Sequence, residues 1–138
     1  MVSNMSRTIM TYERLNEKYL RDGEDLFSKG DYSQASEKFW GAAAEITKAF
    51  ATKRGRKTRT HDDLWKFVIE LDKQNPELDL IRDFYDANHL HSNFYEDELL
   101  PEAIQVGANA VRDYVNKIKQ LIKGYVVEGG GSSSFQRG

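Results

Sequence analysis

The chain has 138 residues, of which 39% are hydrophobic and 30% are charged, a composition typical of a single folded domain. Cysteine is absent, which excludes disulfides, thiolate nucleophiles and cysteine-ligated zinc sites. No apolar run is long enough for a membrane span, and the N-terminal stretch lacks the apolar core of a signal peptide. We therefore expect a cytoplasmic protein without a membrane partner.

Positive charge is concentrated in one short stretch, although the net charge of the chain is −2. We call residues 53–59, "KRGRKTR", the basic segment. Such a stretch is either a solvated loop between helices or a local binding surface for a polyanion. The residues that would bind phosphate or nucleic acid are Lys53, Arg54, Arg56, Lys57 and Arg59.

The first half of the chain predicts two helices joined by a tight turn. The first runs roughly over 11–29, and Gly30 is suited to end it in a left-handed cap. Asp31 can then cap a second helix over 32–53, with Gln34 completing a capping-box pattern. The apolar face of this second helix comprises Ala35, Phe39, Ala42, Ala43, Ile46 and Phe50.

Three further helices are expected after the basic segment. Thr60 or His61 caps a third helix over 62–74. An Asn–Pro pair then marks a stop and a restart, which predicts a fourth helix over 76–98. Pro101 begins a fifth helix, whose apolar stripe comprises Ile104, Val111, Val115, Ile118 and Ile122.

These elements predict an all-α fold, an antiparallel up-and-down bundle of about five helices, because short connections favour antiparallel neighbours. We expect a flexible N-terminus over 1–10, one helical-bundle domain over 11–127, and a flexible Gly/Ser-rich tail over 128–138.

Aromatic residues make up 12% of the chain, more than the interior of so small a bundle should hold. Some rings should therefore cover a subunit interface, which favours a homodimer. The rings on the expected helices are Tyr19, Trp40, Trp65, Tyr85, Tyr95 and Tyr114.

Two of the three histidines lie close together on the fourth helix. At about 100° per residue, His91 falls on its apolar side, so we expect a buried ring with a tyrosine, carboxylate or carbonyl partner. His89 points the other way and shares a polar stripe with Arg82, two turns earlier. Because the two imidazoles diverge, they do not form a helical zinc pair, and we expect neither metal nor cofactor.

Arg82 and His89, on one face of the helix, provide the two kinds of side chain that RNA cleavage without a metal requires. An imidazole can remove the proton of the ribose 2′-hydroxyl, and a guanidinium can stabilise the charge that develops at phosphorus. The same pair could instead bind a nucleotide phosphate without cutting it, or form ion pairs across a subunit interface.

The stretch "RDFYDANH" on a five-helix scaffold resembles the HEPN superfamily (higher-eukaryote and prokaryote nucleotide-binding), whose pattern is arginine, a four-to-six-residue spacer and histidine. More closely, "GDYSQASEKFWGAAAEITKAFA", "HDDLWKFV" and "ANHLHSNFYE" resemble the archaeal PaREP-type family, which is similar to HEPN domains. The HEPN resemblance covers about residues 10 to 125.

The resemblance implies roles for three residues: His89 as general base, Arg82 as phosphate ligand and Asp83 as the residue that orients the motif. It also implies a dimer whose Arg–His motifs meet at the two-fold axis. Three functions follow as hypotheses: a non-catalytic module that binds nucleotide, nucleic acid or a partner protein; a metal-independent endoribonuclease; and a toxin–antitoxin component with a nucleotidyltransferase-like partner.

Overall fold

The computed structural model describes residues 3–97 and 99–125. These residues form only helices, which confirms the all-α prediction, and none of the helices is long and apolar enough to cross a membrane. The elements are α1 (Asn4–Ser28), α2 (Tyr32–Lys53), α3 (His61–Gln74), the 3-10 helix η1 (Pro76–Leu78), α4 (Leu80–Glu96) and α5 (Pro101–Gly124).

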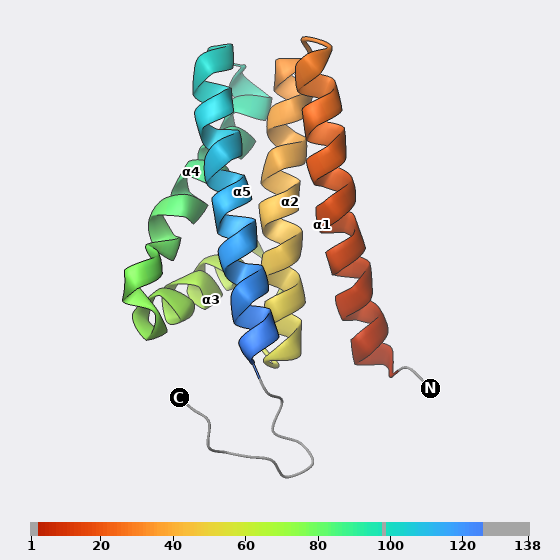
Figure 1. Ribbon diagram of the computed structural model, residues 1–138, viewed down its shortest axis with the longest axis vertical. Coiled ribbons are helices and arrows are strands. Elements are labelled where there is room, and N and C mark those ends of the chain that lie inside the picture. Colours follow the sequence, from red (N-terminus) through yellow and green to blue (C-terminus); the bar gives the residue numbers. More distant parts are fainter. Residues whose placement is uncertain (1–2, 98, 126–138) are drawn as a thin grey trace.

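Helix α2 is the centre of the bundle and contacts all four other α-helices (Figure 1). In Figure 1, α1, α2 and α5 run alongside one another, whereas α4 leans against them and α3 lies across the lower half. Small residues on α2 make this packing possible. A Cβ atom added at Gly41 would lie 2.9 Å from the ring of Tyr19, so α1 can approach closely only because that side chain is missing.

Aromatic rings fill the interior where α2, α3, α4 and α5 meet. The ring centroid of Phe84 lies 5.4 Å from that of Trp40, 4.7 Å from that of Trp65 and 5.5 Å from that of Tyr114. Trp40 and Tyr114 are buried within the single chain. These two rings therefore belong to the core and are not among those that could cover a subunit interface, because edge-to-face and tilted packing accommodates them inside one chain.

Most helix ends follow their local signals. Gly30 has a φ of 84°, Pro101 begins α5, and the Thr60 side chain caps α3 in a complete capping box with Asp63. The N-terminus differs from the prediction: α1 begins at Asn4, because the Ser3 hydroxyl accepts a hydrogen bond from the backbone N–H of Ser6. Residues 4–10 are thus helical and do not form a separate N-terminal segment.

The expected fourth helix is broken near its start. Asp79 has a φ of 57° and a ψ of 44°, which separates η1 from α4. Asn75 is at the N-cap position of η1 but makes no side-chain capping hydrogen bond there, and it donates its side-chain amide to the Leu71 carbonyl in α3. The Asp72 side chain, on α3, accepts a hydrogen bond from the backbone N–H of Ile81 and thus satisfies one of the free N–H groups in the first turn of α4. The expected tail over 128–138 and Glu98 lie outside the described residues.

Candidate functional site

The predicted Arg–His face lies on the side of α4 that points away from the bundle. Arg82 and His89 are both exposed, and the ring of Tyr85 lies 5.6 Å from that of His89, centroid to centroid. Within the described residues, neither Arg82 nor His89 forms a side-chain hydrogen bond or an ion pair. The two side chains therefore remain available to a ligand or a partner.

Asp83 has a different environment from the two residues with which it was grouped. Its carboxylate accepts a hydrogen bond from Lys117 Nζ on α5 at 2.7 Å, and the same ammonium donates to the Leu78 carbonyl at 2.7 Å. Burial raises the pKa of Asp83 more than Lys117 lowers it. The structure thus gives Asp83 a role in joining α5 to the η1–α4 junction, and its hydrogen bonds do not include Arg82 or His89.

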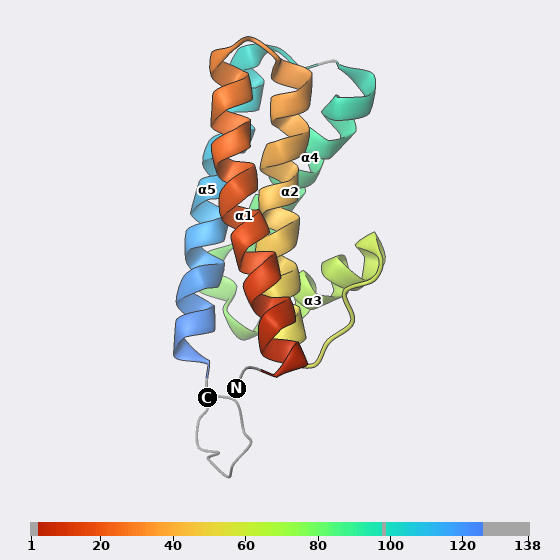
Figure 2. The ribbon, with the colours of Figure 1, turned by 90° about the vertical axis from the view of Figure 1, so that its right-hand side faces the viewer.

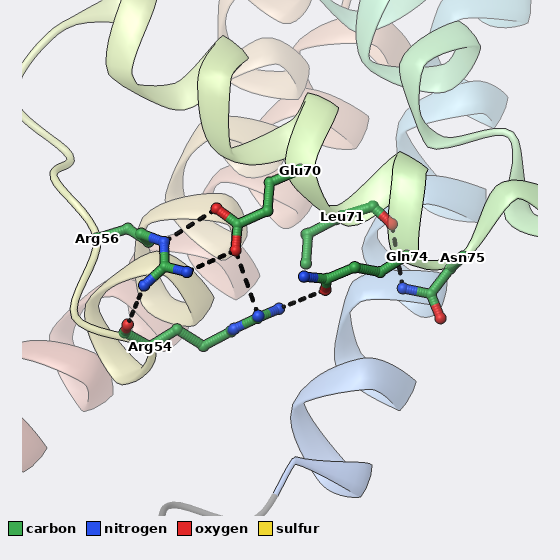
Figure 3. A network of polar contacts seen from close by, with 6 residues as sticks. All are labelled: Arg54, Arg56, Glu70, Leu71, Gln74 and Asn75. Atoms are coloured by element: carbon green, nitrogen blue, oxygen red, sulfur yellow. Dashed lines mark hydrogen bonds and ion pairs between the residues drawn. The ribbon is translucent and has the colours of Figure 1, made fainter. Parts of the chain in front are cut away.

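Two arginines of the basic segment are already paired (Figure 3). The Arg56 guanidinium donates to both Glu70 oxygens, at 2.9 and 2.7 Å, and Arg54 donates to Glu70 at 3.3 Å and to Gln74 at 3.0 Å. The hydrogen bond from Arg56 holds the pKa of Glu70 below its ordinary value. Arg54 and Arg56 therefore join the end of α2 to α3, which reduces their availability to a phosphate.

The other cations of the basic segment differ in this respect. Among the described residues, the side chains of Lys53, Lys57 and Arg59 form no ion pair, in contrast to Arg54 and Arg56. Lys57 and Arg59 occupy the stretch that leads to His61, the first residue of α3. Two of the three unpaired cations thus precede the start of α3, whereas Lys53 is the last residue of α2.

A second group of polar residues lies where α2 and α4 meet. His91 Nδ1 is 2.8 Å from Glu37 Oε1, and the His91 ring stacks on Trp40 with centroids 5.3 Å apart and planes 29° apart. The sequence predicts a tyrosine, carboxylate or carbonyl partner for His91, and the structure shows that the partner is a carboxylate. The imidazole is not sealed in the core, however, because 24% of its side chain remains exposed.

His61 and Tyr95 complete this group. The His61 ring lies 4.9 Å from that of Trp40 and 5.2 Å from that of His91, and the Tyr95 ring lies 5.3 Å from that of His91, centroid to centroid. Figure 2 shows that the start of α3 and the end of α4 project on the same side of α2. We call this group the histidine cluster; its members are Glu37, Trp40, His61, His91 and Tyr95.

The cluster favours a neutral imidazole at His61. Partial burial lowers the pKa of His61, and His91 and Lys48 lower it further, whereas Glu37 raises it. At His91, the Glu37 carboxylate accepts the Nδ1 proton, which leaves Nε2 as the nitrogen available for another contact. Two imidazoles, one of them oriented by a carboxylate, can together accept and donate protons.

His61, Glu37 and Trp40 were not predicted from the sequence to belong to a site. The spacing of Glu37 and Trp40 places them on one face of α2, but their contacts with His91 join residues more than 50 positions apart. Such contacts depend on how α2 and α4 pack and have no local signal. In residues 3–97 and 99–125, no group of three or more histidine, aspartate or glutamate side chains is arranged to hold a metal ion.

Comparisons with known proteins identify the family. A family model described as the archaeal PaREP1/PaREP8 family matches residues 11–115. The crystal structure of a protein from Sulfolobus solfataricus is similar, with 26% sequence identity and a TM-score of 0.69, over 78% of this chain and 96% of that one. A comparison with curated proteins found no match. The chain belongs to the archaeal PaREP1/PaREP8 family.

Proposed function

We propose that this protein is a helical-bundle module that binds single-stranded RNA on the side where α3 begins and α4 ends. One observation carries the proposal: Lys57 and Arg59, two of the three unpaired cations of the basic segment, lead directly to His61 in the histidine cluster. The resemblance to HEPN domains supports the same class of ligand.

The chemistry of this surface suits a single strand. Lysine and arginine side chains neutralise backbone phosphates, which provides affinity without sequence preference. Tyr95 is 71% exposed and stands against the His91 ring, so its free face can stack on an unpaired base. Base stacking needs unpaired bases, and this favours a single strand over a duplex.

Fluorescence anisotropy of a labelled single-stranded RNA, measured over a range of salt concentrations, tests the proposal. The double variant Lys57→Gln/Arg59→Gln should bind more weakly, and the slope of log affinity against log salt should fall by about 0.7 for each lost phosphate contact. The matched control is Arg7→Gln/Lys29→Gln, which removes two exposed cations, one on α1 and one at its C-cap. Equal affinity of both variants and the wild type would contradict the proposal, as would an absence of binding by the wild type.

A second function, metal-independent endoribonuclease activity of the Arg–His pair, is favoured by the exposure of Arg82 and His89 on one face of α4. His89 would act as the general base and Arg82 would hold the phosphate, as the resemblance implies. The test is cleavage of labelled RNA in EDTA, in which His89→Ala should lose activity and keep its fold. Undiminished cleavage by His89→Ala would exclude this role.

A further inference from the structure

The geometry points to the histidine cluster as an acid–base site that cleaves single-stranded RNA at the 2′-hydroxyl. This inference rests on the proposed binding of RNA beside Lys57 and Arg59. It differs from the Arg82–His89 hypothesis in its residues and in its location, because His91 faces α2 whereas His89 faces away from the bundle.

His91 is placed to act as the base. Glu37 fixes the proton on Nδ1 through a contact of 2.8 Å, so the lone pair of Nε2 is free to accept a proton from substrate. Trp40 packs against one face of the imidazole and limits its rotation. A fixed tautomer and a fixed ring plane lower the cost of orienting the base at the moment of proton transfer.

His61 is placed to act as the acid. Its ring lies 5.2 Å from that of His91 and comes from another helix, so the two imidazoles can reach different oxygens of one phosphodiester. His61 is exposed at the start of α3, beside the unpaired cations that would hold the neighbouring phosphates. This pairing places one proton acceptor and one proton donor around a single phosphorus atom.

The step balances with these residues alone. The ribose 2′-oxygen attacks phosphorus and gives its proton to His91 Nε2. The bond between phosphorus and the 5′-oxygen breaks, and protonated His61 gives its proton to that oxygen. The products are a 2′,3′-cyclic phosphate and a 5′-hydroxyl, and exchange with water restores both imidazoles. DNA lacks the 2′-hydroxyl, so it should bind without being cut.

The direction of the His61 pKa predicts the pH dependence of this step. The charged and titratable groups around His61 are Glu37 and Lys48 on α2 and His91 on α4, and the net effect, with burial, lowers its pKa. Because the acid must be protonated, the cleavage rate should fall as pH rises through the lowered pKa of His61, which lies below the ordinary 6.5. This decline should disappear in His61→Asn, together with most of the activity.

The experiment measures binding and cleavage separately on the same labelled RNA, in EDTA, with a fully 2′-deoxy strand as the substrate control. His91→Asn keeps a polar atom near the position of Nδ1 but removes Nε2, and should slow cleavage about 100-fold with little change in affinity. Glu37→Gln should lower kcat and alter the pH profile while KM is kept, because Glu37 is a positioning residue. The matched control is Ser92→Ala, an exposed neighbour of His91 on α4.

Each outcome has a distinct meaning. Cleavage lost in His91→Asn and His61→Asn, with binding and the circular dichroism spectrum unchanged, supports the inference. Wild-type protein that binds RNA but does not cut it overturns the inference and leaves the proposed function standing. Absence of binding overturns the proposed function itself. Cleavage that survives in His91→Asn but is lost in His89→Ala overturns the inference in favour of the outer face of α4.

Discussion

The Tyr114 hydroxyl lies in the centre of the bundle, with its oxygen 2.6 Å from Thr47 Oγ1. Thr47 donates its own proton to the Ala43 carbonyl, so Tyr114 is the donor in this pair. We expect Tyr114→Phe to lower the free energy of unfolding by about 0.5–1.5 kcal/mol, the net value of an intramolecular hydrogen bond, in urea denaturation. Tyr95→Phe, at an exposed ring, is the control and should leave the free energy unchanged; equal effects would contradict the assignment.

The environment of His61 makes stability depend on pH with a definite sign. Its pKa is lowered below the ordinary 6.5, so near that pH the unfolded chain binds more protons than the folded one. The contribution of His61 is therefore fully present above about pH 7 and declines as pH falls through the folded-state pKa. We expect His61→Gln to melt with a weaker pH dependence than the wild type between about pH 5.5 and 7.5. Parallel melting curves for the two proteins would refute this.

At the scale of helices, Gly107 sets how closely α5 approaches α4. A Cβ atom at this position would lie 2.7 Å from Leu90 Cδ2 and 2.9 Å from its Cγ. Alanine in a helix ordinarily gains about 0.5–1 kcal/mol over glycine, but overpacking costs about 1–3 kcal/mol. Gly107→Ala should therefore destabilise the protein in thermal and urea unfolding. Gly124→Ala, where no atom lies within 4 Å, is the control, and a stabilised Gly107→Ala would contradict the close packing.

Helix ends that depend on neighbouring residues could be predicted from the sequence, and ends that depend on distant ones could not. Gly30, Thr60 and Pro101 act within a few residues of the ends that they define. The break at Asp79 is different, because the start of α4 is supported by Asp72 from the preceding helix. The apolar periodicity contains no signal for this break, so the predicted fourth helix ran through Asp79.

At the scale of the whole molecule, the exposed side of α4 is the surface that we expect a second copy to cover. Ile81 and Tyr85 are 37% and 57% exposed there, on the same helix as Arg82 and His89. Sedimentation velocity at micromolar concentration should show a dimer that Tyr85→Glu dissociates, because the introduced charge would be buried without a partner. Val106→Glu, at an exposed position on α5, should remain dimeric; a monomeric wild type would refute the homodimer.

The arrangement of the candidate sites shows what a single sequence can and cannot predict. The Arg82–His89 stripe follows from helical periodicity within one element, and so does the inward direction of His91. The histidine cluster depends on three helices meeting, and the pairing of Arg54 and Arg56 with Glu70 depends on how α3 folds back on α2. The sequence alone identifies five cations in the basic segment. Only the packing of α3 on α2 shows that Arg54 and Arg56 form ion pairs within the protein.

Helix α1 is the first helix of the bundle and packs mainly on α2. Its Glu24 also forms an ion pair with Arg112 on α5. The departure of α1 would leave the contacts among α2, α3, α4 and α5 in place. The interface between α1 and α2 is the most extensive one between two helices, so the attachment of α1 depends on a single surface of α2. Native-state hydrogen exchange would separate an opening of α1 from an opening of the central core, two events that a melting temperature combines in one value.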